Sequence, residues 1–204
     1  MSRTWIYTLA VLAIATVLCA GTAMAQIPDD VYFVSYFSNA HTDFSDATVR
    51  IDNPGVDAQK GLCAYIYVFD NVEEQVECCG CFLTADGLRT ISVNNGLTTN
   101  PSSGPLHKPT SGVFKIVSGA PNVGGKTCDP TGGASLSGGF KNNIKPTADL
   151  RAWATHIQAN GGTSEEEFAD ATLTQTELNG LQETCFGLRQ LGSGKGVCSC
   201  GFGD

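Results

Sequence analysis

The residues of this sequence best able to do chemistry are its cysteines. The chain has 204 residues and nine cysteines, of which only Cys19 precedes residue 60. Cysteines in an oxidising compartment form disulfides, whereas thiolates can also hold a soft metal such as zinc. The eight others form an even set, which in an exported chain predicts a disulfide framework of unknown connectivity: Cys63, Cys78, Cys79, Cys81, Cys128, Cys185, Cys198 and Cys200.

Strand geometry limits how these cysteines pair. Because successive side chains of a strand point to opposite faces, Cys78 and Cys79 need separate partners. Cys79 and Cys81 share a face, and so do Cys198 and Cys200 if the tail is extended. We therefore expect two short antiparallel strands to join these two pairs as a double rung.

The other four cysteines are expected to form two more disulfides. On a regular hairpin we expect Cys63 to pair with Cys78, which leaves Cys128 for Cys185.

A metal site is the alternative to this disulfide framework. The dense runs C-C-G-C and C-S-C also resemble soft-metal sites, but export favours disulfides. The lack of C-x-x-C spacing argues against a thioredoxin-type centre. We expect neither a bound metal nor another cofactor.

No other motif indicates a reaction. The three histidines, His41, His107 and His156, lie in or beside predicted loops or an ambiguous segment, and no serine stands in G-x-S-x-G. The acidic residues are scattered, without the EF-hand pattern. We therefore predict a protein that is not an enzyme; the alternative, a secreted hydrolase, requires a carboxylate pair or a histidine-centred cluster in a cleft.

The first 25 residues read as a signal peptide. Arg3 precedes an apolar run, and Ala23-Met24-Ala25 is the small-x-small pattern accepted by a signal peptidase. Cleavage would change the net charge from −8 to −9, which disfavours nucleic acid and acidic membrane surfaces as partners. Since no second long apolar run follows, we expect no membrane span in the mature chain, which would be secreted to the extracellular space or cell surface.

The elements that position these cysteines are predicted to be mainly β. Runs of β-branched and aromatic residues alternate with turn signals, as in an antiparallel β-sandwich stabilised by disulfides. The run ATVRIDNPG followed by the strand YVFD resembles β-sandwich modules common in secreted bacterial proteins, which implies the same architecture. We place the sandwich core at residues 26–118, with six candidate strands at 31–37, 47–52, 62–70, 75–83, 88–95 and 112–119.

The C-terminal part is predicted to pack on this core. A Gly/Pro-rich connection covers residues 119–146, and residues 147–204 hold a strand, a helix and the cysteine-containing tail. Residues 150–158 fit either a helix or a strand, and we favour a strand. Residues 163–168 suggest a short helical turn. The one clear helix spans residues 175–191, with a capping box formed by Thr174 and Glu177 and with Gly192 as its stop.

Some predicted strands are apolar on both faces, which suggests that another element or another subunit covers the second face. Residues 62–70 are apolar on both faces, so either the C-terminal helix with Trp153 or a second subunit must cover one of them. A strand near the new N-terminus could leave its own sheet and complete that of a neighbour. We expect a non-enzymatic structural protein that self-associates into an extracellular fibre or cell-surface assembly through Val31, Tyr32, Phe33, Val34, Tyr36 and Phe37.

The alternative is a monomeric secreted module that binds a surface glycan or another ligand. Aromatic rings stack on sugars and other flat ligands when they are exposed. Tyr65, Tyr67 and Trp153 are the candidate platform. This hypothesis requires the three rings to lie together at the surface.

Overall fold

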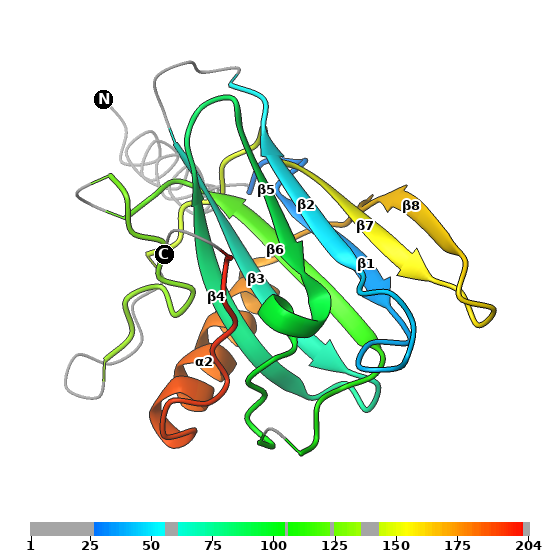
Figure 1. Ribbon diagram of the computed structural model, residues 1–204. Helices are drawn as coiled ribbons and strands as arrows, with labels where there is room; N and C mark the ends of the chain where they lie inside the picture. Colours follow the sequence, from blue (N-terminus) through cyan, green and yellow to red (C-terminus); the bar gives the residue numbers. More distant parts are fainter. Residues whose placement is uncertain (1–26, 56–60, 105, 123–124, 136–142, 202–204) are drawn as a thin grey trace, which may run out of the picture.

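Two antiparallel β-sheets with an α-helix beside them make up the part of the protein that the structure describes (Figure 1). The computed structural model describes residues 27–55, 61–104, 106–122, 125–135 and 143–201, so the predicted signal peptide lies outside the described residues. Sheet A has the strand order β4 (Gln75–Leu83), β3 (Leu62–Asp70), β6 (Gly112–Gly119), β1 (Tyr32–Phe37) and β9 (Ala169–Asp170). Sheet B has the order β5 (Gly87–Ser92), β2 (Thr48–Asn53), β7 (Arg151–Ile157) and β8 (Thr163–Glu167).

The predicted fold class is confirmed, with two local differences. All six candidate strands form, and residues 151–157 are also a strand. Strand β5 ends at Ser92, where a single π-helical turn, η1 (Val93–Leu97), begins; the Ser92 hydroxyl accepts a hydrogen bond from the Asn95 amide. The helical turn predicted over residues 163–168 is wrong, because this segment is the edge strand β8.

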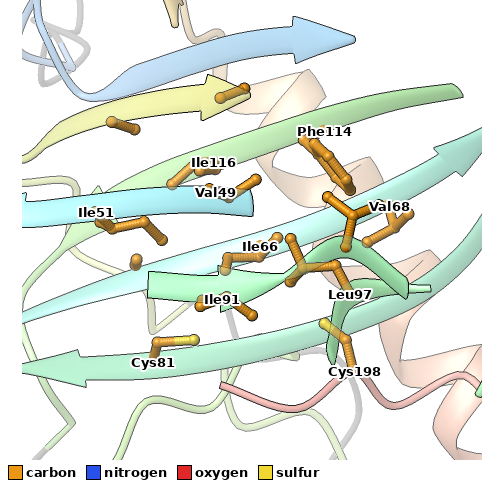
Figure 2. Close-up of a cluster of buried hydrophobic side chains, with 14 of the residues drawn as sticks. Val49, Ile51, Ile66, Val68, Cys81, Ile91, Leu97, Phe114, Ile116 and Cys198 are labelled. Atoms are coloured by element: carbon orange, nitrogen blue, oxygen red, sulfur yellow. The ribbon is translucent and has the colours of Figure 1, made fainter. Parts of the chain in front are cut away.

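The main core fills the space between the sheets. Strands β3 and β6 turn Ile66, Val68, Phe114 and Ile116 inward from sheet A, facing Val49, Ile51 and Ile91 of sheet B (Figure 2). All of these side chains are at most 1 % exposed. Burial of each such side chain contributes roughly 1.5–3 kcal/mol, so this layer holds the sheets together.

A second core lies on the other face of sheet A, where helix α2 (Gln175–Leu191) packs (Figure 1). Tyr65 and Tyr67 of β3 meet Leu178 and Leu181 of the helix there. The chain's own helix therefore covers the second face of β3. Trp153 has no part in this layer, because it lies half-buried on β7 in the other sheet.

Helix α2 begins and ends where its sequence signals predict. The Thr174 hydroxyl accepts a hydrogen bond from the Glu177 amide at 3.1 Å, and the Gly192 amide donates to the Leu188 carbonyl at 2.8 Å. Among the described residues, no helix combines the length and the apolar character that crossing a membrane requires.

Candidate functional site

The eight predicted cysteines form four disulfides. Two of them, Cys79–Cys198 and Cys81–Cys200, join strand β4 to the C-terminal tail as the predicted double rung. The predicted antiparallel direction is wrong. Both bridges span the same sequence separation of 119 residues, so the tail runs parallel to β4. Residue Val197 forms a parallel bridge with Cys78 in the same place.

The other two pairs differ from the prediction. Cys63 is bonded to Cys128, and Cys78 is bonded to Cys185 of helix α2. In the hairpin Cys63 lies opposite Phe82, whereas Cys78 lies opposite Tyr67. That offset of four residues places Cys63 and Cys78 roughly 13 Å apart along the strands, and a disulfide needs Cα atoms within about 7 Å.

The tail closes the β4 edge of sheet A. The Cys78 amide donates to the Gly196 carbonyl at 3.0 Å, and the Cys198 amide donates to the Cys78 carbonyl at 3.3 Å. The Ser199 amide donates to Gly96, next to sheet B, at 3.0 Å. Since an open edge invites another strand, this clamp removes the β4 edge from association.

A thiolate-based metal site does not fit this arrangement. The sulfur atoms of Cys79, Cys81 and Cys200 lie within 4.8 Å of one another because two disulfides are neighbours on one strand. Zinc binds deprotonated thiols, and a sulfur atom in a disulfide has no thiolate to offer. The cluster braces the sheet edge.

The predicted assembly strand is part of its own sheet. All six residues of β1 pair with β6, and only Phe33 and Val34 pair with β9 on the other side. Val31, Tyr32, Phe33 and Phe37 are buried, whereas Val34 is half-buried and Tyr36 is 48 % exposed. The strand is thus held on one side along its full length. On the other side, β9 pairs with Phe33 and Val34, and the Ala171 amide donates to the Tyr32 carbonyl at 2.9 Å.

Two side-chain contacts fix the ends of β1. The Tyr32 hydroxyl donates to Oε1 of Glu177 at 2.8 Å, and Lys115 Nζ donates to the same oxygen at 2.7 Å. Burial would raise the pKa of Glu177, but these two donors outweigh it and lower that pKa. At the other end, the exposed Tyr36 ring stacks on His156 with their centroids 4.1 Å apart.

His156 is a buried base beneath the strand edge. Its side chain is 1 % exposed, and neither ring nitrogen has a hydrogen-bond partner among the described residues. Burial lowers the pKa of His156, although Oε2 of Glu166 lies 3.8 Å from its Nε2 and opposes that shift. The neutral imidazole therefore serves as a flat surface for Tyr36.

The predicted aromatic platform does not form. Tyr65 and Tyr67 are fully buried beneath helix α2, and their hydroxyls donate to the carbonyls of Ala120 and Pro130, each at 2.9 Å. Burial raises the pKa of both phenols. Trp153 belongs to sheet B. Because two of the three rings are inaccessible, the correction is that this set cannot stack on a ligand.

Glu77 is a notable group that the sequence reasoning missed. This carboxyl group lies on β4, is 0 % exposed, and accepts a hydrogen bond from the Asn100 amide at 2.8 Å. Its second oxygen has no partner among the described residues. Burial raises the pKa of Glu77 to about 8, against the opposing effects of Asn100 and Lys108. The available signal was strand alternation, since Glu77 has the same parity as the inward-facing Cys79 and Cys81.

Comparison with known proteins adds no family. No family model matches the chain, and no curated protein matches it significantly. One solved structure, the Anabaena sensory rhodopsin transducer, aligns with 48 % of this chain and 94 % of its own at 16 % identity and a TM-score of 0.34. A TM-score that low carries no argument about fold or function, so the function must be argued from the geometry above.

Proposed function

We propose that the protein is an exported, non-enzymatic structural protein that self-associates by strand addition, as a subunit of an extracellular fibre or cell-surface assembly. Its four disulfides suit an oxidising compartment. Each disulfide contributes roughly 2–4 kcal/mol to the stability of the sandwich by restricting the unfolded chain.

The observation that carries this proposal is the thin cover of β1. Strand β9 pairs with Phe33 and Val34, and the rest of that edge, near the exposed Tyr36, lies beyond it. The β4 edge is clamped by the tail, and the β8 edge carries the three exposed glutamates of residues 165–167, which would repel a like-charged copy. The β5 edge of sheet B lies beside the tail, because Nη1 of Arg89 donates to the Cys200 carbonyl at 3.4 Å and Gly201 lies next to the Thr90 carbonyl. We therefore propose the β1 edge as the one that receives a strand.

We propose that β1 accepts a strand from a second copy, in place of the expected role in which β1 itself leaves its sheet. Because β1 is paired with β6 over its whole length, leaving the sheet would break that ladder and expose Phe33 and Phe37. A second copy would instead add an extended segment alongside β1. A head-to-tail contact of this kind repeats without closing, which produces a filament.

The test is the oligomeric state of the oxidised protein, measured by light scattering after size exclusion and by negative-stain electron microscopy. We expect association that increases with concentration. Tyr36→Lys should abolish it, since an exposed lysine on an edge strand discourages pairing. Leu88→Lys is the matched control, because Leu88 is 63 % exposed on the edge strand β5 of the other sheet.

A monomer at all concentrations would contradict the proposal. So would equal loss of association in the Tyr36 and Leu88 variants, since that result would not distinguish the β1 edge from the β5 edge or from a general change in solubility. Circular dichroism of both variants checks that the sandwich is intact. The second candidate, a ligand-binding module, is favoured by a cleft described below and not by the aromatic platform.

A further inference from the structure

The clamped side of strand β4 contains a cleft of about 490 Å³, which we call the basic cleft. Its walls come from β4, β5, the loop at residues 126–130, the last turn of α2 and the C-terminal tail. A volume of several hundred Å³ is typical of small-molecule sites. The charged side chains that line it are Arg89, Lys126 and Arg189.

The charge of this cleft is opposite to that of the chain. The protein has a net charge of −8, yet the described residues that line the cleft include no acidic side chain. Asp129, just outside the lining, accepts a hydrogen bond from Nη1 of Arg189 at 3.2 Å and offsets one of the three positive charges. The remaining excess of positive charge is focused in a hollow, where it attracts anions more strongly than on a flat surface.

The cleft is built before any ligand arrives. The Arg89 guanidinium donates to the Phe82 carbonyl from Nε at 3.1 Å and to the Cys200 carbonyl from Nη1 at 3.4 Å. These two bonds hold the arginine between β4 and the tail. A Cβ atom on Gly80 would lie 2.1 Å from the Cys128 carbonyl oxygen, so the glycine allows the loop to cross the strand at this point.

The disulfides make the walls rigid. Cys78–Cys185 ties the helix to β4, Cys63–Cys128 ties the loop to β3, and the double rung ties the tail. Disulfides therefore attach the elements that carry Lys126 and Arg189 to sheet A, whereas Arg89 of β5 is held by its hydrogen bonds to the Phe82 and Cys200 carbonyls. A site that is already ordered loses less entropy on binding, which increases affinity.

We propose that the basic cleft binds a small oxyanion, meaning a sulfate, phosphate or carboxylate group. Guanidinium groups match the oxygen spacing of such anions, and the lysine adds a point charge. A second hollow of about 390 Å³ shares Phe82, Arg89 and Cys200 with the cleft and could hold an uncharged body such as a sugar ring. This site is separate from the β1 edge and does not depend on self-association.

The experiment is isothermal titration of the oxidised protein at low ionic strength with two probes, inorganic sulfate and glucuronate. The probes share the oxyanion but differ in source, one inorganic and one a sugar acid. We expect at least one to bind, and Lys126→Glu to weaken that binding at least about 10-fold by reversing a charge in the cleft. Arg189→Gln should weaken it in the same direction.

Lys145→Glu is the matched control, because Lys145 is exposed and lies outside the basic cleft. It makes the same change in net charge and should leave binding nearly unchanged. The proposal is overturned if neither probe binds up to about 10 mM, a very weak affinity, or if Lys145→Glu weakens binding as much as Lys126→Glu. If only one of the two probes binds, that result supports the site and indicates whether its oxyanion is inorganic or part of a sugar acid. Mass spectrometry without reduction checks that each variant keeps four disulfides.

Discussion

The two edges of sheet A are protected by different means. At β4 the tail is held by two disulfides and by backbone hydrogen bonds at Cys78, whereas at β1 the cover is β9, which pairs with two residues. One edge is closed covalently and the other by a few weak bonds. The difference teaches that the cysteines in this chain both stabilise the fold and determine which edge of sheet A is closed to pairing.

Loosening the tail from the β4 edge should have the largest effect on stability and association. Replacing Cys79 and Cys198 together with alanine removes one rung of the double clamp and avoids a free thiol. We expect the free energy of unfolding to fall by about 2–5 kcal/mol, measured by guanidinium denaturation without reductant. We also expect new association, because the tail is then held by Cys81–Cys200 alone and the part of the β4 edge beside Cys79 opens more readily to pairing.

The matched control is the Cys63→Ala and Cys128→Ala pair, which anchors a loop and leaves the tail in place. Its stability should fall by a similar amount without new association through β4. If both double variants associate equally, the difference between the two edges is not determined by the clamp.

The buried Glu77 on the clamped strand β4 should make the stability of the protein depend on pH. Its pKa is raised by burial from 4.5 to about 8, so the folded state keeps a proton that the unfolded chain releases. The stabilisation is complete below pH 4.5 and is lost as the pH rises through about 8. In this window we expect the free energy of unfolding to fall by up to about 1.4 kcal/mol per pH unit.

Glu77→Gln should remove this contribution between pH 5 and pH 8, because the amide is neutral and still accepts the Asn100 hydrogen bond. Denaturation curves of both proteins across this pH range give the comparison. Glu183→Gln is a control, since Glu183 is an exposed glutamate of α2. Equal pH dependence in the wild type and in Glu77→Gln would contradict the buried state of Glu77.

Removing the hydrogen bond that holds β1 to helix α2 should lower the free energy of unfolding by a smaller amount. Tyr32→Phe keeps the buried ring but removes the donor to Glu177, which retains Lys115. We expect a loss of about 1.5 kcal/mol in the free energy of unfolding, the low end for a hydrogen bond to a charged group, because Glu177 keeps its bond from Lys115. Tyr36→Phe is the control and should be nearly neutral, because its half-exposed ring can still stack on His156. Equal effects would show that Tyr32 acts through its ring alone.

Much of this fold was predictable because the spacing of apolar residues along the sequence indicates which side chains are buried. The apolar stripe of residues 175–191 fixed the helix, and alternation placed Cys79 with Cys81 and Cys198 with Cys200 on shared faces. These features depend on residues close together in the sequence. The partners of Cys63 and Cys78 depend on a loop and a helix more than 60 residues away, so local pattern could not find them.

The candidate sites were harder to predict for related reasons. Tyr65 and Tyr67 looked like a ligand platform because the sequence does not show which face the helix covers. The strand β8 was missed because an exposed edge strand needs no apolar alternation, and its residues are Thr, Ser and three Glu. The basic cleft joins cations from three elements, so its lining exists only once the tail is clamped.

The third edge, at β8, is held by neither disulfides nor a buried donor, so it should respond least to mutation. Arg50 of β2 forms an ion pair with Glu165 of β8, and their side chains are 40 % and 45 % exposed. Arg50→Gln should lower the free energy of unfolding by less than about 1 kcal/mol, because water screens exposed pairs. The difference from wild type should vanish in 1 M NaCl, where the screening length is about 3 Å. A larger loss that persists in salt would mean that Arg50 supports β8 by packing on β7, and the β8 edge would then be held more firmly than the cover of β1.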